Sequence, residues 1–523
     1  MADRDFDVVV VGSGFGGSTA ALRLTEKGYR VAVLEAGRRF DETTYPKTSW
    51  RTRSFFWAPR LGCTGLQRIT LLRDVMVLSG AGVGGGSLVY ANISIEAKKE
   101  TFDAGWPPEI TYAELQPHYG RAGEMLNVKP VPKTQWPNRT KLMKEAADKT
   151  GAGDRFRALD LAVSFDPDWT YEQQNPHSPA HSKAFTNAQG QTQGTCVHLG
   201  NCDIGCDVRA RNTLDFNYLA VAERRGAEIR PLHQVTAIAP DAGGYRVSYN
   251  RIESPNLIPG SATSRLVIVA AGSLGSTELL LRCRNQHATL PAVSARLGIG
   301  WSSNGDFLTP AIHPFRAVNP SRGPTITSAI DFLDHGADGQ DVFIEDGGFP
   351  DVLGGFLRSW TADGSNDARV LAVIETLRPL LTANNLTDHV MPWFAQARDA
   401  ADGRLSLQDG KLALEWDVAG SMPTMEAVVH MHQRLARATE GMALTPLTWT
   451  ITHDLITPHP LGGCNMGRTS ADGVVGHNGE VFGCRNLYVA DGSIVPKAIG
   501  LNPSRTIAAL AERIAAGIVA DGR

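Results

Sequence analysis

A glycine-rich turn near the N-terminus constrains the fold more than any other feature of this sequence. Residues 12–17 read G-S-G-F-G-G, follow a valine run over 7–11 and precede an alanine-rich segment over 18–27. Such a valine run is typical of a parallel strand buried on both faces. A second apolar segment over 29–34 ends at Glu35. This order of strand, turn, helix, strand and acid predicts an α/β fold that begins with a Rossmann-type dinucleotide-binding unit.

Each residue of this unit has a separate expected role. Gly12 permits the tight turn, Gly14 lets the backbone approach a pyrophosphate, and Gly17 lets helix and strand pack closely. Phe15 lies within the same glycine turn, before the helix whose free N–H groups attract phosphate, so we include it among the expected cofactor contacts. Glu35 can accept both hydroxyls of an adenosine ribose, which disfavours NADP. The unit alone does not separate NAD from FAD.

A second glycine cluster follows much later in the chain. Residues 78–92 read L-S-G-A-G-V-G-G-G-S-L-V-Y-A-N. Bare glycines let main-chain atoms approach a ligand, so Gly80, Gly84 and Gly85 are candidates for a second contact with the same large cofactor. A flexible surface loop is the alternative, but the apolar residues on both sides favour a buried segment.

Two further strand-and-turn segments fit a nucleotide-binding sheet. Residues 266–269 predict a strand that ends at a turn containing Gly272, and a strand over 228–235 precedes it. Residues 486–493 read N-L-Y-V-A-D-G-S and predict another strand and glycine turn.

His459 is the strongest candidate for a catalytic side chain. It lies between two prolines in T-P-H-P-L-G-G-C, and both prolines stiffen the loop. Histidine is the side chain most often used for proton transfer near neutral pH. A satisfied core histidine is the alternative.

Asn502 has two interpretations. It lies in G-L-N-P-S, directly before an expected helix over 506–518. Asparagine suits the N-cap of a helix and Pro503 suits its first turn. The same side chain could instead face a ligand.

These segments together resemble the glucose–methanol–choline (GMC) oxidoreductases, and most of all the bacterial cholesterol oxidase branch. The motifs that carry the resemblance are G-A-G-V-G-G-G-S-L-V-Y-A-N, T-E-K-G-Y-R-V-A-V-L-E-A-G-R-R-F, H-P-L-G-G-C and G-x-N-P. The resemblance covers most of the chain, but it is specific only over the first 95 residues and roughly the last 70. It implies non-covalently bound FAD.

The resemblance also implies the architecture. A Rossmann-type FAD-binding domain (1–95, 196–300 and 451–523) is interleaved with covering segments and a mostly antiparallel α+β substrate domain (96–195 and 301–450). Alternating residues over 404–415 predict a hairpin with Asp409-Gly410 at its turn.

In the family, the positions of His459 and Asn502 are catalytic, and Asn502 also approaches the flavin. Val235 matches a residue whose backbone contacts the adenine. The expected cofactor contacts are Gly12, Gly14, Phe15, Gly17, Glu35, Gly80, Gly84, Gly85, Asn92, Val235, Gly272, Asp491, Gly492 and Asn502.

Two features of the middle region stay open. Cholesterol oxidases carry a glutamate that serves steroid isomerisation, and Thr387 and Asp388 lie near its expected position, although Asp388 could be an ordinary surface carboxylate. Cys196, Cys202 and Cys206 lie close together, but their spacing matches no zinc or iron–sulfur pattern, so we expect no metal.

The overall composition describes a globular protein. The chain has 523 residues, 42% of them hydrophobic, and a net charge of -3, which argues against nucleic-acid binding. We find no signal core and no apolar run long enough to insert into a membrane. An odd count of seven cysteines favours reduced thiols and a cytoplasmic location.

The sequence therefore predicts oxidation of a secondary alcohol on a bulky apolar substrate, with a steroid-like 3-hydroxy group favoured. O2 or another acceptor would take the electrons. A flavin-dependent reductase or isomerase of a ketosteroid-like enone is the main alternative. An NAD-linked dehydrogenase would leave the second glycine cluster and His459 unexplained. A non-catalytic flavin-binding protein would leave His459 and Asn502 unexplained.

Overall fold

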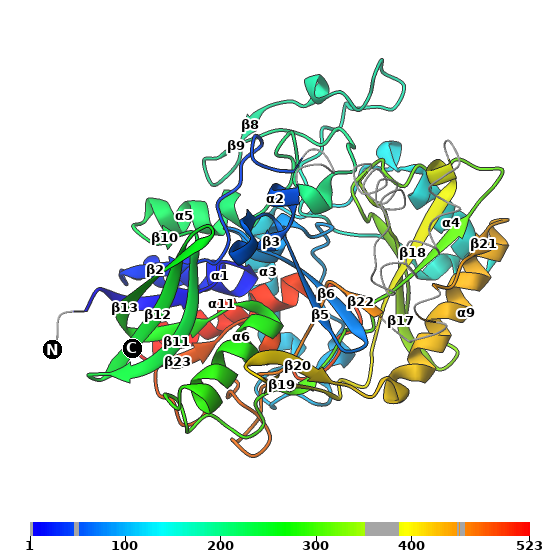
Figure 1. Ribbon diagram of the computed structural model, residues 1–523. Helices are drawn as coiled ribbons and strands as arrows, with labels where there is room; N and C mark the ends of the chain where they lie inside the picture. The colour runs from blue at the N-terminus through cyan, green and yellow to red at the C-terminus, as the bar shows by residue number, and fades with distance from the viewer. Residues whose placement is uncertain (1–3, 47–51, 351–385, 447–448, 450–454, 523) are drawn as a thin grey trace.

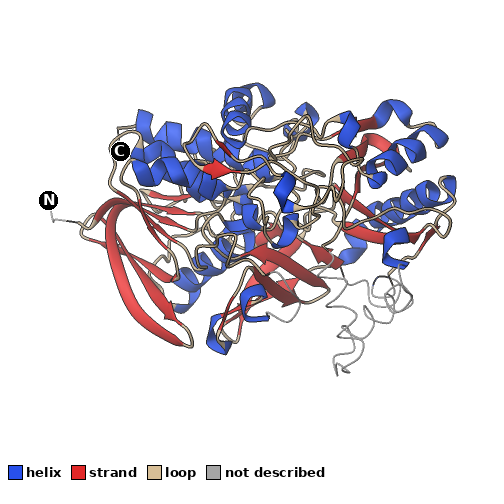
Figure 2. Cartoon of the chain, turned by 90° about the horizontal axis from the view of Figure 1, so that it is seen from above, coloured by secondary structure: helices blue, strands red, loops and turns tan. Residues whose placement is uncertain are grey.

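A computed structural model describes residues 4–46, 52–350, 386–446, 449 and 455–522 of the chain (Figure 1). Two large sheets organise these residues, one near the chain termini and one at the opposite end of the molecule. Figure 2 shows the same division from above, with long antiparallel strands on the side of the termini. The mixed α/β architecture predicted from the sequence is confirmed.

The N-terminal unit folds as predicted. Strand β1 (Phe6–Val11) leads into helix α1 (Phe15–Thr25), and strand β2 (Val31–Leu34) returns parallel to β1. Val8, Val9 and Val10 have no exposed surface, because neighbouring strands flank β1 and helices cover it. The helix begins three residues before the predicted start, so its first turn lies directly on the glycine loop.

The first sheet has seven strands in the order β10-β2-β1-β13-β12-β11, with β23 also paired to β13. Strands β10, β2, β1, β13 and β23 run parallel, whereas β11, β12 and β13 form an antiparallel meander. The additional strands are β10 (Glu228–Arg230), β11 (His233–Asp241), β12 (Gly244–Glu253), β13 (Asn256–Val269) and β23 (Leu487–Val489). Three distant parts of the sequence therefore build one sheet.

The prediction of one strand over 228–235 is wrong. The segment divides into β10 and β11 at Pro231 and Leu232. Proline has no N–H to donate to a ladder, and Leu232 has a φ of 59°, which turns the chain. The strand predicted over 266–269 is the end of the much longer β13.

The second sheet has six antiparallel strands in the order β21-β15-β18-β17-β16-β7. Helices α4 and α9 pack against it, at the right of Figure 1. Its core is a separate apolar cluster that includes the fully buried Trp301 and Trp393. Its elements are β7 (Phe156–Ala158), β15 (Phe307–Ile312), β16 (Ser328–Ala337), β17 (Gln340–Asp346), β18 (Val390–Ala397), β21 (Met442–Ala443), α4 (Asn138–Lys149) and α9 (Met422–Ala438).

The predicted hairpin is confirmed. Strands β19 (Gly403–Gln408) and β20 (Lys411–Glu415) pair antiparallel around Asp409 and Gly410. Both turn residues have positive φ, 49° and 71°, as a type I′ turn requires. The strands of both sheets fall within the segments expected for the two domains, and we keep the boundaries of those domains as a proposal.

The C-terminal helix joins distant parts of the chain. Helix α11 (Ser504–Ala520) packs on α1 and on α3 (Tyr112–Leu126). Its Glu512 is 1% exposed and accepts from Arg23 Nε at 2.7 Å and Nη2 at 2.8 Å. The hydroxyl of Tyr218 donates to the same carboxylate at 2.8 Å. These hydrogen bonds and the ion pair with Arg23 fix α11 against α1.

A small third sheet joins two strands of the N-terminal region to a strand near the C-terminus. Strand β22 (Leu455–Thr457) runs parallel to β6 (Val75–Gly80), which pairs with β5 (Gln67–Leu72). It therefore places the loop of His459 close to the second glycine cluster.

The remaining helices and strands are α2 (Thr52–Phe55), β3 (Trp57–Ala58), β4 (Cys63–Thr64), β8 (Phe185–Thr186), β9 (Thr192–Gln193), α5 (Tyr218–Arg224), α6 (Gly272–Leu281) and β14 (Ile299–Trp301).

The three clustered cysteines serve local packing. The sulfur of Cys196 accepts from His198 N at 3.4 Å, and that of Cys206 accepts from Ala210 N at 3.3 Å. Burial raises the pKa of Cys196 and of Cys202. Across the described ranges, no group of His, Cys, Asp and Glu is arranged to hold a metal. None of the helices in these ranges has the length and apolarity to cross a membrane.

Replacing Gly16 with alanine should destabilise the apoprotein. The new Cβ would lie 1.4 Å from the carbonyl oxygen of Ala490, a main-chain atom that cannot yield easily. We expect Gly16→Ala to lower the free energy of unfolding by roughly 1–3 kcal/mol, measured by denaturant titration. Gly14→Ala is the control, because its Cβ would meet no atom within 4 Å. Equal stability of the two variants would contradict this packing.

Candidate active site

The first glycine loop is closely packed on one side and open on the other. Gly12 has a φ of 94°, and a Cβ there would lie 2.4 Å from Ala270 O. A Cβ on Gly17 would lie 2.0 Å from Gly12 O. In contrast, a Cβ on Gly14 meets nothing within 4 Å, although Gly14 is the N-cap of α1. Phe15 opens that helix. The free N–H groups therefore face open space that a phosphate can occupy.

The second glycine cluster lies against this first loop. A Cβ on Gly85 would lie 2.5 Å from Gly14 Cα. The hydroxyl of Ser13 accepts from Gly84 N at 3.1 Å and lies 3.2 Å from Gly82 O. A Cβ on Gly80 would likewise lie 2.6 Å from Gly85 O. The cluster is thus a buried partner of the first loop and not a surface loop.

Glu35 is buried at the end of β2. Its carboxylate accepts from Ser13 N at 2.9 Å, from the Ser13 hydroxyl at 2.6 Å and from Gly37 N at 2.8 Å. Burial raises the pKa of Glu35, and these hydrogen bonds oppose the shift. The start of β11 is attached here, because His233 N donates to Glu35 O at 2.8 Å. Val235 is half-buried on the same strand, and its contact with an adenine stays a prediction.

Asn92 is fully buried, with a φ of 67°. Its Oδ1 accepts from Arg211 Nε at 2.8 Å. Its Nδ2 has no hydrogen-bond partner among the residues that the structure describes. A buried amide donor without an acceptor is costly, so this atom fits a place beside a ligand.

Asp491 connects the glycine turn that contains Gly272 with the glycine turn that contains Gly492. Its carboxylate accepts from Gly272 N at 2.9 Å, from Ser493 N at 2.8 Å and from the hydroxyl of Ser276. Burial raises the pKa of Asp491, and these donors oppose the shift. Gly492 O in turn accepts from Gly462 N at 3.0 Å, in the loop that follows His459.

His459 is held by a carboxylate that the sequence did not reveal. Nδ1 of His459 lies 2.9 Å from Asp306 Oδ1, and its main-chain N–H donates to Oδ2 at 3.1 Å. The hydroxyl of Thr457 also donates to Asp306. Asp306 has no exposed side-chain surface, whereas the His459 side chain is 19% exposed. Burial raises the pKa of Asp306, and the histidine opposes the shift.

The loop that carries Asp306 also positions the segment before Asn502. Asn304 Oδ1 accepts from Ile499 N at 3.1 Å and Gly500 N at 3.0 Å, and its Nδ2 donates to Leu501 O at 3.0 Å. Residues 302–306 therefore hold the side chain of His459 and the main chain that leads to Asn502.

Asn502 is not the N-cap of α11, so the capping interpretation is wrong. The helix begins at Ser504, and its N-cap residue is Pro503, without a side-chain cap. Asn502 is 4% exposed, and its Oδ1 has no hydrogen-bond partner within the described ranges. Asn304 holds the main chain before it, and Oδ1 is the atom of this side chain that is available to a ligand.

Glu345, at the end of β17, is a second group that the sequence did not reveal. Burial raises the pKa of Glu345 well above its ordinary value, and the amides of Gln396 and Asn502 oppose the shift. Gln396 Nε2 donates to one oxygen at 2.9 Å, while the other has no hydrogen-bond partner in the described part of the chain. Glu345 is paired across the sheet with Phe394, whose ring lies 6.2 Å from that of His459.

A role of Asp388 as a site carboxylate stays a prediction. Thr387 and Asp388 are half-buried, in a short 3-10 helix (Leu386–His389). The main-chain oxygen of Asp388 accepts from Val318 N at 2.7 Å and Asn319 N at 2.8 Å. Glu345 follows the apolar triplet V-F-I, but Asp341 and Asp346 lie on either side of this segment, so the sequence does not single it out. Asp306 gives no signal either, because its partner lies 153 positions away.

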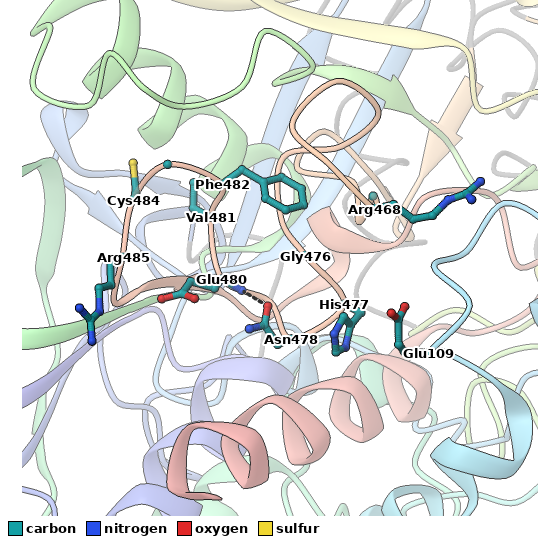
Figure 3. Close-up of a pocket in the computed structure, with 12 residues that line it drawn as sticks. Glu109, Arg468, Gly476, His477, Asn478, Glu480, Val481, Phe482, Cys484 and Arg485 are labelled. Atoms are coloured by element: carbon teal, nitrogen blue, oxygen red, sulfur yellow. Dashed lines mark hydrogen bonds between the residues drawn. The ribbon is translucent and has the colours of Figure 1, made fainter. Parts of the chain in front are cut away.

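A surface pocket of about 630 Å³ lies elsewhere (Figure 3). Its lining includes Glu109, Arg468, His477 and Phe482, on loops beside the C-terminal helix. None of the residues that line it is among the predicted cofactor contacts or catalytic residues, so we assign it no part in the chemistry.

The described residues fit FAD. Open space adjoins Gly14, the glycine loops lie together, and two buried amide atoms, Asn92 Nδ2 and Asn502 Oδ1, lack partners among the described residues. Glu35 and Asp491 both lie at the ends of parallel strands of one sheet, where such folds bind nucleotides.

Comparisons with known proteins agree with this geometry. Residues 399–511 match a family described as GMC oxidoreductase, and residues 7–72 match one described as FAD dependent oxidoreductase. A cholesterol oxidase of Mycobacterium tuberculosis is 36% identical, over 98% of this chain and 90% of that protein. A cholesterol oxidase of Acinetobacter baumannii is 30% identical, over 97% of this chain and 93% of that protein.

Solved structures agree on the fold. Pyridoxine 4-oxidase from Mesorbium loti superposes with a TM-score of 0.66 at 17% identity, over 98% of this chain and 99% of that one. A fungal aryl-alcohol oxidase gives a TM-score of 0.62 at 17% identity, over 99% of this chain and all of that one. By its extended similarity to the cholesterol oxidases and by its fold, the chain belongs to the GMC family of FAD-dependent oxidoreductases, enzymes that oxidise alcohols.

Proposed function

We propose that this enzyme oxidises a secondary alcohol on a bulky apolar substrate, with a steroid-like 3-hydroxy group favoured, to a ketone. The observation that carries the proposal is the pairing of His459 with the buried Asp306. The loop of Asp306 also holds the main chain directly before Asn502, whose Oδ1 has no partner among the described residues. The substrate class rests on the similarity to two cholesterol oxidases.

The surroundings of Asp306 define the role of His459. The carboxylate receives the Thr457 hydroxyl and the His459 main-chain N–H, so we assign it as an ionised acceptor for Nδ1–H. Nε2 is then left without its proton and can accept the proton of a substrate hydroxyl. The positive charge that develops on the ring is stabilised by Asp306.

Asn502 orients the substrate in this proposal. FAD, when bound, supplies the acceptor for the hydride that leaves the alcohol carbon. The amide of Asn502 can contact the substrate oxygen, and the rigid backbone before it restricts where that oxygen can lie. Holding donor and acceptor atoms in one geometry accounts for a large part of the rate in such reactions.

Glu345 supports a second proton transfer. Its burial favours the protonated form, and one oxygen has no hydrogen-bond partner within the described residues. A raised pKa makes the ionised form of this carboxyl a stronger base than an ordinary carboxylate. We propose that the ionised form takes a proton from the carbon beside the new ketone, becomes the acid, and returns that proton at the far end of a neighbouring double bond, which converts a β,γ-enone to the conjugated isomer. We therefore include isomerisation of a ketosteroid-like enone in the proposed function. The closest alternative is an enzyme that acts on such an enone without oxidising an alcohol.

The reaction needs an electron acceptor. We propose O2, because the curated relatives are named oxidases.

Removing His459 or the charge on Asp306 should slow alcohol oxidation without loss of FAD. We expect His459→Ala to lower the anaerobic rate of flavin bleaching by a 3-hydroxysteroid roughly 10²–10⁴-fold, the contribution of a general base. Asp306→Asn should lower it roughly 10²-fold and shift its pH dependence, because the amide no longer selects the tautomer with a free Nε2. Stopped-flow absorbance measures both.

The matched control is an exposed histidine–aspartate pair elsewhere on the surface. His430 Nδ1 lies 3.3 Å from Asp338, and both side chains are at least 60% exposed. His430→Ala and Asp338→Asn should leave the rate unchanged. Wild-type rates in both His459→Ala and Asp306→Asn would exclude the assigned roles.

Replacing Glu345 with glutamine should separate oxidation from isomerisation. Glu345→Gln cannot carry a proton between carbons, so a 3β-hydroxy-5-ene steroid should accumulate as the unconjugated ketone. The ultraviolet absorbance of a conjugated enone would then fail to develop, while the alcohol is still consumed. Formation of the conjugated product at the wild-type rate would assign the proton transfer to another group.

The same variant should change the pH dependence of stability. The pKa of Glu345 is higher in the folded chain than in the unfolded chain, where it is about 4.3. The folded state therefore holds the extra proton above that pH, and the contribution of this group to stability falls as pH rises toward the folded pKa. We expect Glu345→Gln to become more stable relative to wild type as pH increases above about 4.3, by denaturant titration. Exposed Glu415→Gln is the control.

A further inference from the structure

Arg211 is a buried cation bound almost entirely to one loop. It is 2% exposed, and its Nη1 donates to Leu88 O at 2.9 Å. Its Nη2 donates to Ser87 O and, at 3.4 Å, to Tyr90 O. Its Nε donates to Asn92 Oδ1 at 2.8 Å. The guanidinium thus defines the conformation of residues 87–92, which follow the second glycine cluster.

The bond from Nε determines how the Asn92 amide is turned. With Oδ1 committed to Arg211, Nδ2 points away from the guanidinium. It is a fully buried donor for which the described residues offer no acceptor. Asn92 also holds a φ of 67°, which most side chains avoid. Such an arrangement persists when something in the site uses the donor.

The charge of Arg211 is also left available. Within the described ranges, no carboxylate forms an ion pair with it. Its charge lowers the pKa values of nearby acids, among them Asp203, Asp215 and Cys202, against the raising effect of burial. A cation in a low-dielectric interior acts strongly on nearby groups.

We propose that Arg211 is a positioning residue for the bound flavin. It shapes the loop over 87–92, presents Asn92 Nδ2 as a hydrogen-bond donor to an acceptor atom of FAD, and favours the more negative, reduced form of the cofactor through its charge. The inference concerns cofactor binding and potential, so it does not depend on which alcohol the enzyme oxidises.

Asn92→Asp tests the donor directly. The carboxylate has the same shape, tolerates positive φ and can pair with Arg211, so the fold should be retained. It lacks the N–H donor and neutralises the guanidinium. We expect FAD affinity, measured by fluorescence titration of the apoprotein, to fall roughly tenfold, and the midpoint potential of bound FAD to become more negative.

Arg211→Lys and Arg211→Met separate shape from charge. Lysine keeps the charge but cannot bind the carbonyls as a planar fork, so affinity should fall while the potential changes little. Methionine removes both contributions, so affinity and potential should both fall. Arg209→Met is the matched control, because the Arg209 guanidinium lies 4.4 Å from the centre of the Phe216 ring and 3.9 Å from the carboxylate of Glu42, instead of on the loop over 87–92.

The potential distinguishes this proposal from a purely structural role for Arg211. A structural role would lower thermal stability and leave the potential of the remaining FAD unchanged. Wild-type FAD affinity and wild-type potential in Asn92→Asp would overturn the proposal. If Arg211→Met does not fold, the Asn92→Asp and Arg211→Lys measurements decide the question.

Discussion

The loop over residues 302–306 connects the two halves of the molecule, and the candidate active site depends on it. Ser302 exchanges main-chain hydrogen bonds of 3.0 Å with Leu461, two residues after His459. Asp306 lies directly before β15 and reaches His459, while Asn304 holds the chain that leads to Asn502. Asp399 braces the loop through the hydroxyl of Ser302 and the main-chain N–H of Ser303, at 2.6 and 2.9 Å. The second sheet therefore supplies the supports, and the C-terminal segments supply the reactive side chains.

Burial raises the pKa of four carboxyl groups around this connection: Asp306, Asp399, Asp491 and Glu345. They differ in how completely their oxygens are hydrogen-bonded. Asp399 and Asp491 receive main-chain N–H groups and serine hydroxyls on both oxygens, which makes them structural anchors. Glu345 has one oxygen without a hydrogen-bond partner among the described residues. Proton exchange between Glu345 and a substrate therefore disrupts fewer hydrogen bonds of the fold than proton exchange at Asp399 or Asp491 would.

Local signals in the sequence predicted the parts of the fold whose contacts are close in the chain. The strand, glycine turn and helix over 6–25 follow from residues within one supersecondary unit, and the hairpin at Asp409-Gly410 follows from its turn residues. The resemblance at both ends of the chain indicated His459 and Asn502. Asp306 and Arg211 could not be predicted, because their partners come from distant segments and neither lies in a recognisable motif. The N-cap expected at Asn502 was wrong because Asn304 controls the chain at that position.

An anaerobic absorbance titration of the wild-type holoenzyme tests the central claim most directly. A panel of secondary alcohols that includes 3-hydroxysteroids would be added without O2, with NADH and NADPH as comparison reductants. The account predicts that a member of the alcohol panel bleaches the flavin band and is recovered as the ketone, and that the nicotinamides do not. A yellow protein that no alcohol bleaches, but that NADH or NADPH reduces and an enone reoxidises, would contradict alcohol oxidation and establish a reductase.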